Sequence, residues 1–347
     1  MKTIMKTLLV SIASLSLMFS VNAGELTVNG TAKATYNATS GVSADNGIGV
    51  TNELNFTASG EMDNGYTWSY SMELDPSTTG SGQANNDDTQ INLTMNDMGT
   101  IKVCVSECGN NKKYKFDQSA YTSMSDTGQS YGITYPAASG DANKGTIQYH
   151  TPELPFATKL AYAYSSTSAD GSSGNAQGTT TGGDSMNEYS LQTAPIDGLT
   201  LHAQFYDFNT YGDGVSTNDQ AEQGGAYAAT YAFGNLTVGY GKSYKAPAIL
   251  EAVRASGATT VEYYENTGMS LGYAINDDVS VSYTRETSEP SYMTSATTAY
   301  DVEMDSVQIA YSMGGATLSI ARADVENHSY VNGQDLTETI VAMSFAF

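Results

Sequence analysis

The stretch "TIVAMSFAF", residues 339–347, alternates large apolar residues with smaller ones. The large side chains fall on every second position and small ones lie between them: Phe347, Phe345, Met343 and Val341, against Ala346, Ser344 and Ala342. Successive side chains of a β-strand point to opposite faces, so the pattern predicts a strand with one strongly apolar face. Chain ends are usually loose and polar unless something holds them, which predicts that this strand is paired within a sheet.

The first 23 residues have the three parts of a secretory signal peptide. Lys2 and Lys6 give a positive start, an apolar run extends from Leu8 to Phe19, and "VNA" supplies small residues at a cleavage site. The run is too short and too interrupted by serines to be a membrane-spanning helix. The sequence therefore predicts a signal peptide at 1–23, cleaved after Ala23, and one mature domain at 24–347.

The predicted mature domain is acidic and rich in tyrosine. Without Lys2 and Lys6 it keeps 12 of the 14 basic residues against 37 acidic ones, a formal charge of −25. Such a charge argues against nucleic acid as a partner. Disordered acidic chains contain few aromatic residues, whereas this chain has 25 tyrosines, so an ordered fold is favoured.

Alternation with a period of two continues along almost the whole chain. In "YTWSYSMEL", residues 66–74, large apolar side chains alternate with Thr, Ser and Glu. The pattern predicts sixteen strands, at 25–37, 48–61, 66–75, 87–96, 100–106, 145–151, 156–165, 186–194, 199–208, 224–233, 236–244, 259–274, 278–286, 301–313, 316–325 and 336–347. All seven prolines are predicted to lie between strands, because proline cannot donate to a ladder.

The predicted connections alternate in length. Seven are tight turns, "MDNG", "NDMG", "PELP", "PIDG", "GN", "NDD" and "GG", and the other eight are longer and polar. Short turns on one side, long loops on the other and an even strand number are typical of an outer-membrane barrel. A soluble β-sandwich would also alternate, but it would not need this asymmetry. We therefore predict an all-β, sixteen-stranded antiparallel transmembrane barrel with short periplasmic turns and long outer loops.

With its signal peptide, sixteen spans, eight loops and terminal aromatic residue, the chain resembles the general porins of Gram-negative outer membranes, in their sixteen-stranded, alphaproteobacterial-like form. The resemblance implies a lipid-embedded homotrimer in the outer membrane. It implies passive diffusion of small hydrophilic solutes and ions. It also implies that the barrel-assembly machinery recognises the terminal stripe of Phe347, Phe345 and Met343, and we expect Phe347 to pair beside Leu26 and Val28.

The resemblance also implies that the third outer loop folds into the barrel as a constriction. The third long gap, 107–144, is the longest and carries acids and lysines: Asp117, Asp126, Asp141, Lys112, Lys113 and Lys115. The usual Pro-Glu-Phe-Gly loop motif is absent, and the whole chain has only three arginines, Arg254, Arg285 and Arg322, whereas the family has a ladder of arginines on the wall.

Strand parity predicts which charged side chains point into the barrel. The inward lysines are Lys33, Lys102 and Lys159, and the inward acids are Glu53, Glu61, Glu73 and Glu188. The candidates for pore lining or constriction are Lys33, Glu53, Glu73, Lys102, Asp117, Asp126, Lys159 and Glu188. Inward acids give the lumen a negative potential, so we expect a preference for cations.

Cys104 and Cys108 form a C-x3-C pair at the end of the fifth predicted strand. Two thiols with no nearby histidine do not make a zinc site, and an exported chain with two cysteines favours a disulfide. An extended chain would hold the two α-carbons ~13 Å apart, too far to bridge, so the predicted disulfide requires a turn directly after Cys104.

The sequence shows no catalytic or metal-binding pattern. His150, His202 and His328 fall on different hairpins, and no G-x-S-x-G motif is present. "GYGKS", residues 239–243, lacks the first glycine of a phosphate-binding loop and lies on a predicted strand. We expect no enzyme, metal or cofactor. The alternatives to a channel are a non-conducting adhesin or anchor, and an outer-membrane hydrolase, which would need a Ser–His or acid–His pair.

Overall fold

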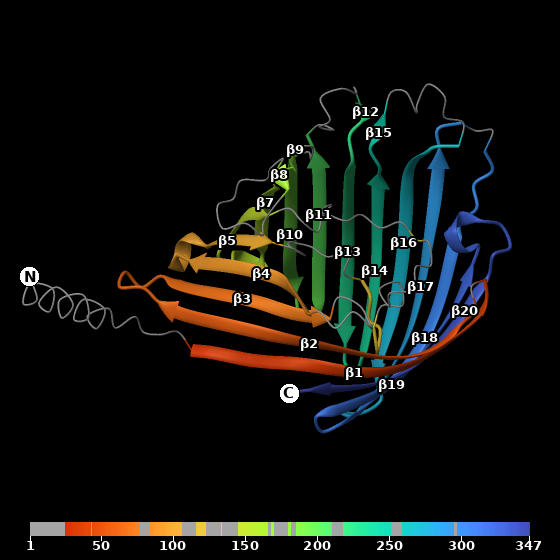
Figure 1. Cartoon of the computed structure of the whole chain (residues 1–347), viewed down its shortest axis with the longest axis horizontal. Helices are drawn as coiled ribbons and strands as arrows, with labels where there is room; N and C mark the ends of the chain where they lie inside the picture. Colours follow the sequence, from red (N-terminus) through yellow and green to blue (C-terminus); the bar gives the residue numbers. More distant parts are fainter. Residues whose placement is uncertain are drawn as a thin grey trace, which may run out of the picture.

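The computed structural model describes residues 25–42, 44–76, 84–105, 116–122, 133, 145–165, 168–169, 180–181, 185–209, 218–250, 259–294 and 297–347. The predicted signal peptide lies outside these ranges. None of the helices within them is long and apolar enough to span a bilayer. The described residues form a single closed barrel whose strands follow one another around the wall in chain order (Figure 1).

Sixteen antiparallel strands make up the barrel, as predicted. They are β1 (Glu25–Gly41), β2 (Asn46–Glu61), β3 (Thr67–Pro76), β4 (Ala84–Thr94), β5 (Thr100–Val105), β6 (Thr146–His150), β7 (Lys159–Ser165), β10 (Met186–Ile196), β11 (Leu199–Phe208), β13 (Gln223–Phe233), β14 (Leu236–Ala246), β16 (Val261–Ala274), β17 (Val279–Tyr292), β18 (Val302–Met313), β19 (Ala316–Glu326) and β20 (Leu336–Ala346). The barrel closes where β20 pairs with β1 over eleven residue pairs, so neither terminal strand is a free edge.

Within the described residues, four short strands and three short helices lie in the connections. Two pairs of short strands form small sheets in the longer connections: β8 (Ser168–Ala169) with β9 (Thr180–Thr181), and β12 (Asn218–Gln220) with β15 (Ile249–Leu250). The 3-10 helices are η1 (Asn96–Met98), η3 (Pro155–Ala157) and η4 (His328–Tyr330). We use "turn end" for the side with the seven short connections and "loop end" for the other.

The prediction that every proline lies between strands is wrong for three of them. Pro76 is the last residue of β3, and Pro195 falls in the register shift near the end of β10. Pro290 lies within β17, which extends six residues beyond its predicted end. The pairing of β17 with β18 stops at Ser288 and Val302, so Pro290 has a partner strand on one side only. Proline is tolerated at such edges because no ladder bond is lost there.

The register divides every strand into an outer and an inner face. The outer face carries exposed large apolar side chains, and on β20 these are Val341, Met343 and Phe345, with Ala342 buried between them. The same face of β18 carries Ile309, which pairs with Ile320 of β19. An apolar exterior over alternate residues is what a membrane-spanning barrel requires.

Part of the inner face is unexpectedly apolar. Eight buried side chains form a cluster on the inner face of β18, β19 and β20: Val302, Met304, Ala321, Ala323, Val325, Leu336, Ile340 and Ala342. Tyr121 and Ile133 of the third long connection, and Tyr330 of η4, pack against this cluster. The inner wall of these three strands is therefore covered by protein instead of facing an open lumen.

Candidate functional site

A segment of the third long connection, residues 116–122, lies along the inner wall of the barrel. Its first residue, Phe116, is only 3% exposed and packs against Ala226 and Ala228 of β13. A side chain added at Gly268 would begin 2.1 Å from Cζ of Phe116, and one added at Gly239 would begin 1.8 Å from the Phe116 carbonyl oxygen. Glycine at both positions therefore lets the segment contact the wall directly.

The next residues of the segment cross three strands, held by one polar side chain after another. Backbone N–H groups donate from Gln118 to Ser270 Oγ of β16 (2.8 Å), from Ala120 to Ser282 Oγ of β17 (2.8 Å), and from Tyr121 and Thr122 to Gln308 Oε1 of β18 (2.9 and 3.2 Å). Gln308 Nε2 donates back to the Thr122 carbonyl oxygen at 2.7 Å. The inward folding implied by the family resemblance is therefore present in these seven residues.

Asp117 faces the wall. Its Oδ1 accepts hydrogen bonds from the hydroxyl groups of Ser119 (2.6 Å), Thr284 (3.0 Å) and Ser270 (3.4 Å), and from the Ser119 N–H (3.1 Å). Four donors to one carboxylate oxygen orient it toward β16 and β17. The structure thus gives Asp117 an anchoring contact with the wall. Asp126, the other acid proposed for the constriction, lies outside the described residues.

Three of the predicted inward residues lie together on the inner face of β1, β2 and β3. Glu53 Oε2 accepts a 3.4 Å hydrogen bond from the hydroxyl of Thr31, which is its cross-strand partner. Lys33 Nζ lies 5.6 Å from the ring centre of Tyr121, so it reaches the inserted segment. Glu73 follows on the same face of β3. These charges form a polar sector of the wall.

The other wall residues are more dispersed. Lys102 of β5 lies opposite Gln148 on the inner face. Glu188 is on the inner face but fully buried, and Gln204 Nε2 donates to it at 3.1 Å. Lys159 begins β7 at the turn end, where its ammonium group lies 3.8 Å from Glu153 and its side chain is largely exposed. The structure therefore does not bring Lys159 or Glu188 to the polar sector.

Sequence reasoning missed two further buried acids on the inner face. Glu338 of β20 is fully buried and accepts a hydrogen bond from the Asn37 side-chain amide, and Glu286 of β17 is 2% exposed. Their parity is visible in the sequence, but their burial is not, because nothing in the strand pattern shows which part of the wall other segments cover. Within the described ranges, no three Cys, His, Asp or Glu residues approach closely enough to hold a metal ion.

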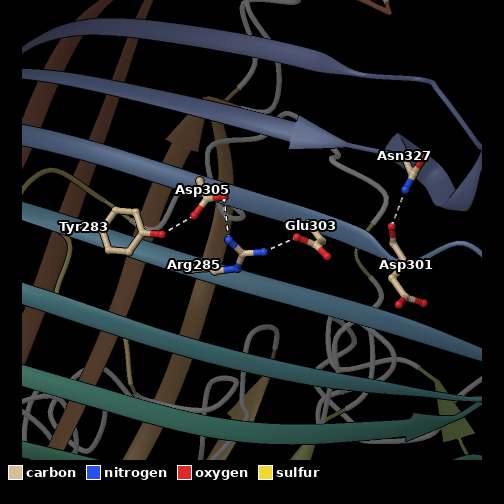
Figure 2. Close-up of polar contacts among 6 residues, drawn as sticks. All are labelled: Tyr283, Arg285, Asp301, Glu303, Asp305 and Asn327. Atoms are coloured by element: carbon tan, nitrogen blue, oxygen red, sulfur yellow. Dashed lines mark hydrogen bonds and ion pairs between the residues drawn. The ribbon is translucent and has the colours of Figure 1, made fainter.

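The two arginines of the described strands point outward. Figure 2 shows Arg285 of β17 between Glu303 and Asp305 of β18, and Tyr283 donates its hydroxyl proton to Asp305. Arg322 of β19 forms a similar pair with Asp324 at 3.1 Å, and Arg254 lies outside the described residues. These side chains share the outer face with the apolar residues nearer the turn end, so the described inner wall contains no arginine ladder.

Cys104 is buried on the inner face at the end of β5 and is disulfide-bonded. The predicted partner, Cys108, lies outside the described residues. The pairing of the two cysteines therefore stays a prediction.

The comparisons with known proteins identify the architecture. No protein-family model matches the chain, and no curated protein matches it. The anion-selective porin from Comamonas acidovorans is 11% identical, with a TM-score of 0.63, over 93% of this chain and 100% of that one. A triple mutant of Rhodopseudomonas blastica porin is 14% identical, with a TM-score of 0.57, over 93% and 100%. Salmonella typhi OmpF in complex with daunomycin is 14% identical, with a TM-score of 0.67, over 94% and 98%.

These matches cover nearly the whole of each chain, although the sequence identities are low. The described barrel therefore has the fold of the general bacterial porins, which confirms the predicted fold class and, at the level of fold, the resemblance.

Proposed function

We propose that this barrel is a passive diffusion channel for small hydrophilic solutes and ions in the outer membrane of a Gram-negative bacterium. The observation that carries the proposal is the inserted segment 116–122, bound along the inner wall of a closed barrel. Support also comes from the polar sector of Lys33, Glu53 and Glu73 on the inner face of β1, β2 and β3.

The location follows from the exterior and from the sequence. Exposed apolar side chains cover the outer face, and the predicted signal peptide at 1–23 would direct export. The partners proposed are outer-membrane lipid, the barrel-assembly machinery acting on the stripe of Phe347, Phe345 and Met343, and two further copies of the chain in a homotrimer. We propose no catalytic activity and no cofactor.

We further propose a modest preference for cations. The mature chain is strongly acidic, and Glu53 and Glu73 lie in the polar sector, whereas Lys33 and Lys102 oppose them. Screening limits each charge to a range of about 8 Å at physiological ionic strength, so only charges near the narrowest section influence selectivity. Glu188, Glu286 and Glu338 are buried and contribute little at the water-filled surface.

Planar-bilayer recording of the purified protein tests the proposal. We expect stepwise, ohmic openings, and a reversal potential in a salt gradient with the sign of cation preference. Absence of any conductance from folded protein would favour the non-conducting adhesin or anchor. Ohmic openings with an anion-selective reversal potential would retain the channel and overturn the charge assignment.

A further inference from the structure

We propose that Phe116 and the two glycines beneath it form a latch that sets the open cross-section of the lumen. The inference rests on the proposed channel function. It states that β13, β14 and β16 bind Phe116 and so keep the inserted segment against the wall. The Phe116 side chain and backbone contact four small residues of the wall, Gly239, Gly268, Ala226 and Ala228, which we call the Phe116 socket. The socket joins β13, β14 and β16, which lie side by side in the barrel (Figure 1).

The socket is closely fitted to its occupant. Phe116 is 3% exposed although it lies inside a barrel, and its ring occupies the space that any side chain at Gly268 would need. The Phe116 backbone occupies the corresponding space at Gly239. Glycine weakens a strand interior, so two such positions beneath one residue indicate a site shaped for close approach.

The socket also sets the position of the residues that follow. Beginning one residue after Phe116, the side chain of Asp117 and the N–H groups of Gln118 and Ala120 bond to the hydroxyl groups of β16 and β17. Each of these hydrogen bonds is individually weak because water competes for both partners. Anchoring the first residue in an apolar socket keeps the later groups near their partners, which favours all of the bonds together.

The direction of the effect follows from the geometry. With the latch closed, the segment lies against the wall of β14, β16, β17 and β18, and its Tyr121 ring approaches Lys33 of the polar sector. We expect a segment released from these contacts to move away from the wall into the interior of the closed barrel, because the connection stays joined to β5 and β6. Opening the latch therefore narrows the water path and makes the conductance fluctuate.

A size exchange between the two sides of the socket tests the latch. Gly268→Phe places a ring where the Phe116 ring lies, so the segment must leave its seat. We expect lower mean conductance with frequent closures. Adding Phe116→Gly removes the competing ring and should restore conductance toward the wild-type level. Gly47→Phe is the matched control, because Gly47 lies on the inner face of β2 and a side chain there would meet nothing within 4 Å.

Hydrogen–deuterium exchange provides a readout that does not depend on conductance. The amides of Gln118, Ala120, Tyr121 and Thr122 should be protected in the wild type and exchange at least about tenfold faster in Gly268→Phe, because loss of the wall bonds removes most of their protection. Heat-modifiable migration checks that each variant is a folded barrel.

The outcomes separate the latch from the proposed function. If the wild-type protein showed no conductance in bilayers while Gly268→Phe still lost amide protection in the inserted segment, the channel function would be overturned. The contact of Phe116 with its socket would be retained. Gly268→Phe with wild-type conductance and wild-type protection would overturn the latch. So would a Gly47→Phe variant that reproduced both changes, or a double variant that restored neither.

Discussion

Phe347 and Gly30 exchange two backbone hydrogen bonds, of 2.8 and 3.0 Å, across the seam between β20 and β1. The Phe347 ring lies against Gly30 as well, because a side chain added at Gly30 would begin 3.0 Å from a ring carbon of Phe347. The residue expected to carry the assembly signal is therefore also part of the backbone pairing that closes the barrel. The expected neighbours were Leu26 and Val28, and the observed partner lies two residues beyond Val28.

Deletion of Phe347 should lower the yield of folded barrel. Both bonds to Gly30 would be lost together with the terminal aromatic side chain. Heat-modifiable migration of the membrane fraction measures the folded amount. Phe347→Ala separates the two effects, since it retains the backbone bonds and removes only the ring. A deletion variant that assembled as well as the wild type would show that neither contribution matters.

Gln308→Ala should release the far end of the inserted segment. Gln308 bonds to two N–H groups and one carbonyl oxygen of Tyr121 and Thr122. At about 0.5–1.5 kcal/mol net for each bond, exchange of these two amides should rise by roughly tenfold or more. The amide of Gln118, held by β16, should change much less. Equal acceleration at all three residues would mean that the segment opens as a unit.

Lys102→Glu should increase the preference for cations. The residue lies on the inner face of β5, so the substitution changes the charge of the wall by two units. The reversal potential in a salt gradient measures the preference, which should weaken at high salt because the charges are screened. Lys159→Glu is the comparison, since Lys159 lies at the turn end beside Glu153. An unchanged reversal potential for Lys102→Glu would place Lys102 away from the narrowest section.

Mass spectrometry of non-reduced peptides should find Cys104 joined to Cys108. Cys104 is buried and disulfide-bonded, and the chain contains two cysteines. Protein purified without reductant should therefore resist alkylation until it is reduced. Alkylation of both thiols under those conditions would exclude the bridge.

Asp301→Asn should stabilise the loop end of the barrel at neutral pH. Burial raises the pKa of the Asp301 carboxyl, and the nearby Glu303 raises it further. A raised pKa in the folded state means that ionisation opposes folding, so the wild type becomes relatively more stable as the pH falls through that pKa. The advantage of Asn should therefore be present at pH 7 and vanish below the ordinary Asp range. The temperature at which heat modification occurs, compared between variant and wild type at each pH, measures this stability difference. A difference that did not depend on pH would show that ionisation of Asp301 is not its cause.

The strand pattern could be predicted from the sequence because successive side chains of each strand point alternately outward and into the barrel. The outward position of Arg285 was accessible too, since it has the parity of Val279, Val281 and Tyr283. The sequence does not predict the extension of β17 beyond residue 286, because that part is polar and contains Pro290. There β17 pairs mainly with β16, so it lacks the apolar alternation of a strand with two partners.

The contacts of the inserted segment could not be predicted in the same way. Gln118 and Ser270 are 152 residues apart in the chain, and Tyr121 and Gln308 are 187 apart. Periodicity describes neighbours along and across strands, whereas these pairs depend on where a connection comes to rest. For the same reason, the burial of Glu286 and Glu338 has no signature in the local sequence.

The outward ion pairs of Arg285 and Arg322 have a consequence for how the barrel fits a bilayer. On β18 the apolar residues Val307 and Ile309 lie directly on the turn side of Asp305. Sliding the barrel inward would carry charges into hydrocarbon, at about 2–4 kcal/mol for an arginine at the midplane, and sliding it outward would expose the apolar band. In a bilayer of a different thickness, hydrophobic mismatch on this side must therefore be met by local deformation of the lipid instead of by a vertical shift of the protein.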